Sequence, residues 1–148
     1  MENKYKKILI IDDNAKIINM ISEILHKNNY EVLVAKDGKT GIERAELGNP
    51  DLILLDIMMP DLDGYETCAL LKNNEKTKSI PIIFISALVD ELDKVKALEM
   101  GASDFISKPI NDGELLIRIK THITISELTN QLMKAKEELA LKFKNLPN

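Results

Sequence analysis

The sequence lacks the features that mark exported, membrane-bound or nucleic-acid-binding proteins. Cys68 is its one cysteine, so no internal disulfide forms and the chain suits a reducing compartment. After the basic opening segment, only Ile8–Ile11 is continuously apolar, which is too short for a signal-peptide core or a membrane helix. The net charge of −4 offers no basic footprint for nucleic acid. We therefore expect a cytoplasmic protein, with neither nucleic acid nor membrane as a partner of this chain.

The composition is that of one globular domain. The 148 residues are 45% hydrophobic and 30% charged, which is ordinary for a chain that buries a single core. The sequence contains no internal repeats and no low-complexity tracts. The order of its elements therefore has to come from the apolar pattern and the turn residues.

Short apolar runs bounded by turn residues alternate with helical patterns five times. The runs are typical of strands buried on both faces: Ile8–Ile11, Glu31–Ala35, Leu52–Asp56, Ile80–Ile85 and Asp104–Ser107. Asp63 with Glu66, and Asn111 with Glu114, have the spacing of helix N-caps. Five βα units predict an α/β fold with a parallel, doubly wound sheet. For five strands the flavodoxin-like order 2-1-3-4-5 is the usual arrangement.

Polar residues follow four of the five predicted strands. Asp12 and Asp13 end the first strand, Asp56 the third, Ser86 the fourth and Lys108 the fifth. All would lie at the carboxyl edge of the sheet, where open α/β sheets bind ligands. Carboxylates brought together repel one another, and Mg²⁺, which prefers oxygen ligands, relieves that repulsion. One nucleophilic carboxylate with a divalent metal, a lysine and a hydroxyl suits an incoming phosphoryl group.

The sequence resembles the receiver domain of two-component response regulators over roughly residues 5–123. Matching stretches lie, in order, on the predicted strand ends: Ile10–Asp13, Leu55–Pro60 with Asp63-Gly64, Ile85–Ala87 and Gly101–Pro109. The resemblance implies a phosphoacceptor that assists its own modification, and not an enzyme. Its phosphoryl donor would be the phosphohistidine of a sensor histidine kinase.

The resemblance also implies a role for each site residue. Asp56 would accept the phosphoryl group. Asp13 would bind Mg²⁺ directly, Asp12 largely through water, and Met58 through its main-chain carbonyl, with the modified Asp56 completing the site.

Three further residues would respond to the modification. Ser86 would donate a hydrogen bond to the phosphoryl group, and Lys108 would pair with it, followed by a cis bond to Pro109. Phe105 occupies the aromatic switch position and would turn inward when Ser86 moves.

Rival interpretations fail on single positions. A haloacid-dehalogenase-type enzyme needs a second aspartate two residues after the nucleophile, where this chain has Met58. A flavodoxin or another nucleotide-binding protein needs a glycine-rich loop after the first strand, where this chain has Asp12, Asp13 and Asn14. A degenerate receiver that only binds partners would lack an acceptor or metal position, and none is missing.

Residues away from the carboxyl edge carry weaker expectations. The resemblance also implies that Met58 and Leu88 line the path of a hydrolytic water. Because neither side chain orients or deprotonates water, we expect slow autodephosphorylation. Cys68 is expected to be buried. His26 and His122 are interpreted as surface residues without carboxylate partners.

The C-terminal segment departs from a compact domain. Residues 1–123 are assigned to the receiver domain and 124–148 to a helical extension, a candidate coiled-coil linker to an absent output domain. Leu116, Ile119 and Ile123 should face the sheet. A second apolar set follows spacings of three and four: Ile125, Leu128, Leu132, Ala135 and Leu139. This set predicts a protruding helix that pairs in a parallel dimer, with a helix folded back on its own domain as the alternative.

Overall fold

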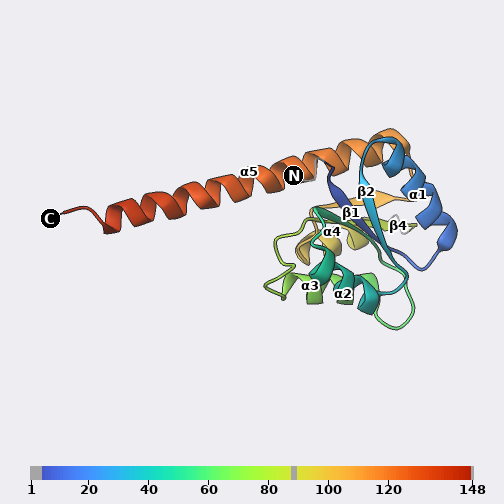
Figure 1. Cartoon of the computed structure of the whole chain (residues 1–148). Coiled ribbons are helices and arrows are strands. Elements are labelled where there is room, and N and C mark those ends of the chain that lie inside the picture. The colour runs from blue at the N-terminus through green and yellow to red at the C-terminus, as the bar shows by residue number, and fades with distance from the viewer. Residues whose placement is uncertain (1–4, 88–89, 148) are drawn as a thin grey trace.

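The computed structural model describes residues 5–87 and 90–147. Five strands and five helices alternate along the chain (Figure 1). The strands are β1 (Lys7–Ile11), β2 (Glu31–Ala35), β3 (Leu52–Asp56), β4 (Ile82–Ser86) and β5 (Asp104–Ser107). The helices are α1 (Ala15–Lys27), α2 (Gly38–Gly48), α3 (Gly64–Lys72), α4 (Glu91–Glu99) and α5 (Asp112–Lys144).

The strands form one parallel sheet in the order β2-β1-β3-β4-β5, as the sequence predicts. The register pairs Ile11 with Leu55, and Ser86 with Ser107. Strand ends that are far apart in the sequence therefore meet at one edge. The predicted fourth strand is too long at its start: β4 begins at Ile82, because Pro81 has no N–H for the ladder and only its carbonyl pairs, accepting the Ile53 N–H at 2.9 Å.

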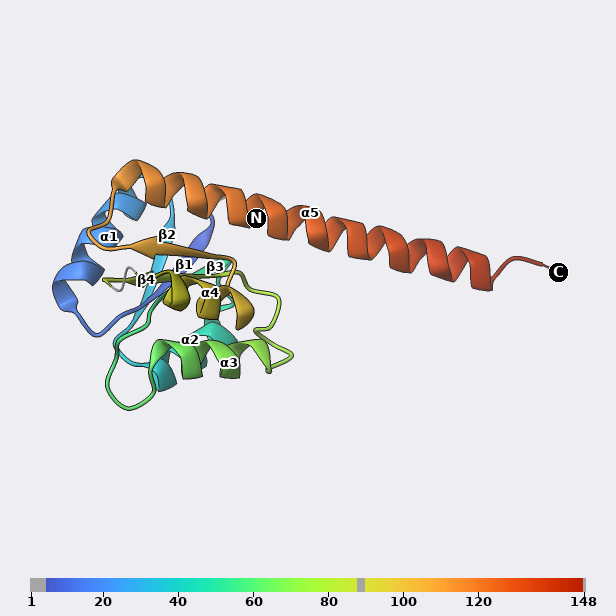
Figure 2. The same cartoon turned by 180° about the vertical axis from the view of Figure 1, so that it is seen from behind.

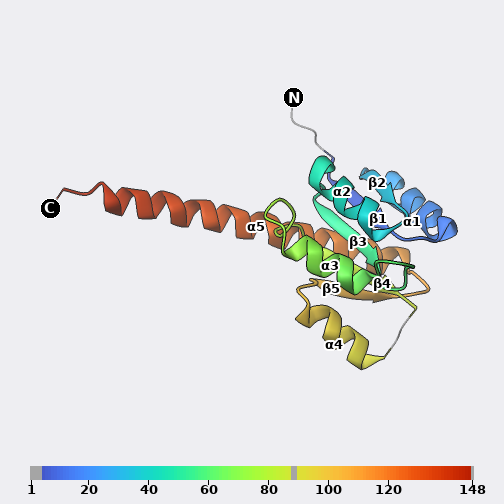
Figure 3. The ribbon, with the colours of Figure 1, turned by 90° about the horizontal axis from the view of Figure 1, so that it is seen from below.

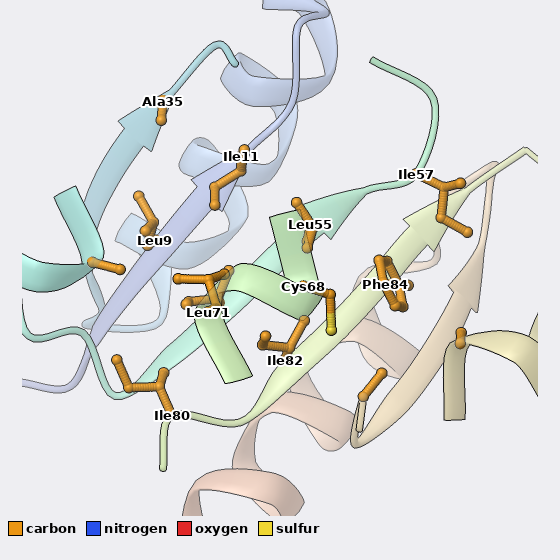
Figure 4. Packing of buried hydrophobic residues seen from close by; sticks show 14 of the residues in the cluster. Leu9, Ile11, Ala35, Leu55, Ile57, Cys68, Leu71, Ile80, Ile82 and Phe84 are labelled. Carbon is orange, nitrogen blue, oxygen red and sulfur yellow. The ribbon is translucent and has the colours of Figure 1, made fainter. Parts of the chain in front are cut away.

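Helices cover both faces of the sheet and enclose two apolar layers. The layer under α2, α3 and α4 contains Leu9, Leu55, Cys68, Leu71 and Phe84 (Figure 4). The opposite layer joins α1 and the first part of α5 to the other face of the strands. In Figure 3, α2 and α4 lie toward opposite edges of the sheet. Strands β1, β3 and β4 are buried on both faces. From its second residue to the carboxyl edge, each of them is therefore continuously apolar.

The predicted helix caps are present. Asp63 accepts the Glu66 N–H at 2.8 Å, and the Asp63 N–H in turn donates to the Glu66 carboxylate. Asn111 accepts the Glu114 N–H at 2.9 Å, whereas the Glu114 carboxylate pairs with Arg118 instead of completing the box. Each cap satisfies an N–H group that has no partner inside its helix.

Helix α5 has two parts with different surroundings. Its first part buries Leu115, Ile119 and Ile123, with Leu116 only partly buried, so Leu115 takes the central position expected for Leu116. From residue 127 to residue 147 every position is exposed. The whole helix has 33 residues and is about 50 Å long, and its second part continues beyond the domain (Figure 2). Over the residues that the structure describes, no helix combines the length and the apolar character needed to cross a membrane.

Candidate functional site at the carboxyl edge of the sheet

The polar residues singled out in the sequence gather at the carboxyl edge of the three central strands and β5. Asp56 is the last residue of β3 and Ser86 the last of β4. Asp12 directly follows β1, and Lys108 directly follows β5. The strand order therefore puts Asp12 and Asp56 side by side at the switch point between β1 and β3.

Three carboxylates form the acidic part of the site. Asp12, Asp13 and Asp56 each offer one oxygen, and these oxygens lie within 4.8 Å of one another. Asp12 and Asp56 are buried, with 2% and 6% of their surface exposed, whereas Asp13 is exposed. The Asn14 N–H donates to Asp12 Oδ1 at 2.9 Å and so orients that carboxylate. A cluster this close has the oxygen donors that a small divalent cation requires.

Lys108 supplies the positive charge beside this cluster. Its Nζ lies 3.3 Å from Asp12 Oδ2 and 3.6 Å from Asp56 Oδ1. The Lys108 N–H donates to the Ser86 carbonyl at 2.8 Å, which holds the lysine beside the end of β4. The Lys108–Pro109 peptide is cis, as the resemblance implies.

Burial raises the pKa of Asp56 from 3.8 to about 6, with the negative charges of Asp12 and Asp13 acting in the same direction. The Lys108 ammonium and the Met58 N–H oppose this increase. Asp56 is therefore a carboxylate whose ionised form is held in an unfavourable environment. A cation that offsets this negative charge would be correspondingly favoured.

The loop after β3 follows the site closely. The Met58 N–H donates to the Asp56 carboxylate. The residue itself is 62% exposed. Gly64 packs its Cα against the strand end: a Cβ there would lie 2.3 Å from the Asp56 carbonyl oxygen. The Gly64 N–H also donates to the Ile57 carbonyl at 2.8 Å. Leu88, the second residue of the lifetime expectation, lies outside the described residues.

Ser86 and Phe105 are near the site in different ways. Ser86 is buried beside Asp56 on the neighbouring strand, because Asp56 pairs with Ile85 in the ladder. Phe105 pairs with Phe84, and its side chain is buried among the apolar residues under α3 and α4. The structure thus places Phe105 on the inner side of β5, away from the carboxylates.

One interpretation from the sequence is wrong. His122 is half-buried and has a carboxylate partner, since its Nε2 lies 2.9 Å from Asp104 Oδ2. Arg118 binds the same carboxylate through Nη1, at 2.8 Å from Oδ1 and 2.7 Å from Oδ2. In the sequence, Glu114, Arg118 and His122 are four residues apart, which indicates that they share one helix face. Only the tertiary fold brings Asp104 to that face. His26 is exposed and Cys68 buried, as expected.

Fold and site together define a flavodoxin-like α/β domain with an acidic cluster and a lysine at its switch point. The family model for the response regulator receiver domain matches residues 8–120. The chain belongs to this family, the receiver domains of two-component signalling systems.

Relatives and solved structures agree with this assignment. The chain is 39% identical over 123 residues to the alkaline phosphatase synthesis transcriptional regulatory protein PhoP of Bacillus subtilis, covering 83% of this chain and 50% of PhoP. It is 39% identical over 117 residues to protein PilG of Pseudomonas aeruginosa, covering 79% of this chain and 87% of PilG. The chain thus spans about half the length of PhoP and most of PilG.

A solved structure carries the same fold with a metal. It is the receiver domain of the sensor histidine kinase PA1611 of Pseudomonas aeruginosa, with a magnesium ion coordinated in its active-site cleft. It is 29% identical, has a TM-score of 0.76, and the match covers 81% of this chain and 98% of that one.

The raised pKa of Asp56 predicts a pH-dependent stability for the metal-free chain. The folded state holds this proton more tightly than the unfolded state, so the free energy of unfolding falls as pH rises from about 4 to about 6. Asp56→Asn removes this cost, which is on the order of 3 kcal/mol above pH 6. In urea unfolding with chelator, the variant should exceed the parent in stability at pH 7.5, and this advantage should vanish near pH 4.

Asp61→Asn is the matched control, because Asp61 lies in the same loop but is exposed and has a left-handed φ of 65° that asparagine tolerates. It should leave the stability unchanged at both pH values. A stability advantage of Asp56→Asn that is equal at both pH values would contradict the assignment to Asp56 ionisation.

Proposed function

We propose that this chain is a phosphorylation-controlled switch in which Asp56 accepts a phosphoryl group from a sensor histidine kinase. It acts as a phosphoacceptor that assists its own modification, and not as an enzyme. The observation that carries the proposal is the convergence of Asp56 with Asp12, Asp13 and Lys108 at one sheet edge.

The groups around Asp56 suit a phosphoryl transfer. An Asp56 carboxylate oxygen forms the new bond to phosphorus while the bond from phosphorus to the kinase histidine nitrogen breaks, and that nitrogen keeps the electron pair. Lys108 Nζ, 3.6 Å from Asp56, stands where it can pair with the transferred oxygens. The buried carboxylate makes a negatively charged nucleophile available without a separate base.

The donor set fits Mg²⁺. Asp12 and Asp13 would hold it, with Asp56 and the Met58 main-chain carbonyl as further ligands. The fit rests first on donors that are all oxygens and lie within 4.8 Å of one another. It rests also on the burial of two carboxylates, for which Lys108 is the one compensating charge among the contacts that the structure describes. When bound, Mg²⁺ would supply the positive charge that offsets the carboxylates and the phosphoryl oxygens.

Ser86 and Phe105 would register the modification. Ser86, buried at the end of β4, would donate its hydroxyl to a phosphoryl oxygen on Asp56. Phe105 would then be held in the inner position that it has here, packed under α4. The changed α4 and β5 surface would act on an output domain or a separate effector.

Met58 further supports a long-lived modification. Its side chain is largely exposed beside Asp56 and has no group that orients or deprotonates water. We infer slow autodephosphorylation, with the signal ended by a phosphatase or by return transfer.

Phosphorylation should depend on Asp56 alone among the aspartates of its loop. With acetyl phosphate and Mg²⁺, the parent chain should gain one phosphoryl group by intact-mass spectrometry. Asp56→Asn should abolish the gain, because an amide is not a nucleophile for this reaction, whereas Asp61→Asn in the same loop should label fully. Labelling of the Asp56→Asn variant to the parent level would refute the assignment.

The lifetime should respond to the residue at position 58. Met58→Asn places a hydrogen-bonding group where water would approach and should shorten the half-life of the modified chain roughly tenfold, which corresponds to about 1.4 kcal/mol in the barrier. Decay is followed by mass spectrometry after the donor is removed. Met133→Asn, an equally exposed methionine on the α5 extension, should not change it. A half-life that is unchanged or longer in Met58→Asn counts against this account.

We also propose that α5 pairs with the α5 of a second copy in a parallel dimer. The α5 seam, defined as Ile125, Leu128, Leu132, Ala135 and Leu139, keeps its heptad spacing and is exposed along its length in the single chain. Exposed leucine and isoleucine at these spacings favour a partner helix. The domain boundary at residue 123 remains a prediction, although Ile123 is the last buried residue of the helix.

Light scattering tests this pairing. At high micromolar concentration with Mg²⁺ and beryllofluoride, the parent should have the mass of a dimer. A chain ending at Ile123 and the Leu132→Glu variant should be monomeric. Leu141→Glu is the matched control, since Leu141 is equally exposed but lies off the α5 seam, and it should remain dimeric. A monomeric parent would rule out the seam as the dimer interface.

A further inference from the structure

A carboxylate at the start of β5 holds the helix that leaves the domain. Asp104 is the first residue of β5, and its Oδ1 accepts the N–H of the next residue, Phe105, at 2.8 Å. Arg118 and His122 reach the same carboxylate from α5, over the distances given above. We call Asp104, Arg118 and His122 the Asp104 clamp.

The chemistry of the clamp makes it a firm attachment. Burial would raise the pKa of Asp104, but the hydrogen bonds from His122 and Arg118 outweigh it and hold this pKa below its usual range. The carboxylate is therefore ionised at neutral pH and accepts from both side chains, so His122 donates through Nε2. Arg118 and His122 are four residues apart and share one face of α5, so a single carboxylate fixes both the position and the rotation of that face.

The clamp lies where α5 leaves the domain. His122 directly precedes Ile123, the last buried residue of α5. Beyond it, among the described residues, one further ion pair joins this helix to the domain, Lys6 with Glu127, and both of those side chains are nearly half exposed. From Ile123 to Lys144 the helix runs about 30 Å, so a tilt of roughly 10° at the clamp moves its far end by about 5 Å.

The clamp also stands at the opposite end of β5 from the site. The strand has four residues: Asp104 in the clamp, Phe105 at the switch position, then Ile106 and Ser107 before Lys108. A shift at Phe105 acts on the adjacent Asp104 through the backbone and through the hydrogen bond that its own N–H donates to that carboxylate. The site and the exit of α5 are thus joined by one short strand about 13 Å long.

We propose that the Asp104 clamp sets the direction in which α5 leaves the domain, and that it transmits a shift of β5, the strand that carries Phe105, to the exposed part of α5. The inference rests on the proposed function, because modification of Asp56 is the input. The three clamp residues are positioning residues: they touch neither the phosphoryl group nor the acidic cluster. The output is a new orientation of the helix, and with it of whatever α5 carries or pairs with.

Spin-label distances test the proposal in the full chain. Labels are placed on cysteines introduced at Glu43 in α2 and Glu137 in α5, both exposed, in a Cys68→Ala background. Labelled chain is diluted into excess unlabelled chain, so that only distances within one chain are measured. Beryllofluoride with Mg²⁺ should shift the mean distance by several ångströms in the parent. Arg118→Ala with His122→Ala should reduce that shift by more than half while beryllofluoride affinity stays within twofold.

Glu114→Ala is the matched control. It breaks the Glu114–Arg118 pair on the same helix without touching Asp104, and should retain the full shift. If the double variant does not fold, the single change His122→Ala, which removes one of the two attachments, should give a partial loss. A clamp variant that melts at a lower temperature but shifts as the parent does has lost only stability, and that result overturns the proposal.

The remaining outcomes separate the two levels of inference. A parent that binds beryllofluoride without any movement of α5 overturns the clamp proposal and leaves the proposed function standing. A parent that neither binds beryllofluoride nor labels with acetyl phosphate overturns the proposed function, and the clamp proposal falls with it.

Discussion

The structure depends on one electrostatic constraint, the placement of three carboxylates at the carboxyl edge of a parallel sheet. Asp12 and Asp56 are buried, and Asp13 completes a cluster whose oxygens lie within 4.8 Å. Such a cluster is unfavourable in a folded protein unless positive charge approaches it. Lys108 provides part of that charge from the end of β5, and the raised pKa of Asp56 shows that the compensation is incomplete. An acidic cluster in this condition favours a nearby cation, which would offset its negative charge.

The rest of the fold holds these charges at fixed places. Continuous apolar strands, buried between two helix layers, give each strand end a rigid position, and the parallel register aligns the ends at one edge. The loop after β3 is shaped by Gly64, whose lack of a side chain allows α3 to begin directly against the Asp56 carbonyl. Precision at the site therefore comes from packing around it as much as from the polar residues themselves.

Helix α5 is packed in the domain over its first part and exposed over its second part. Its first part is a core element, held by Leu115, Ile119 and Ile123, and its second part carries an apolar seam that the single chain leaves exposed. The Asp104 clamp lies at the transition between the two parts. Under the clamp proposal, a shift of β5 would become a change in the direction of α5.

Local patterns in the sequence determined the fold class, the strand order and the residues at the carboxyl edge. These follow from short apolar runs, from caps such as Asp63 with Glu66, and from the preference of five βα units for one topology. Each of these patterns involves only a few neighbouring residues, so it can be recognised in a single sequence. The start of β4 lies two residues after the predicted start, because Pro81 contributes only a carbonyl to the ladder.

Only the tertiary structure decided the features that depend on distances between residues far apart in the chain. The pKa of Asp56 depends on burial and on Asp12, 44 positions earlier, and on Lys108, 52 positions later. The contact of Gly64 with the Asp56 carbonyl depends on the path of the loop between them. His122 was interpreted as a surface residue because its partner, Asp104, lies on another element and meets it only once β5 and α5 pack together. Spacing along a chain specifies which residues share a strand end or a helix face, but the energy of a charge depends on everything that surrounds it in space.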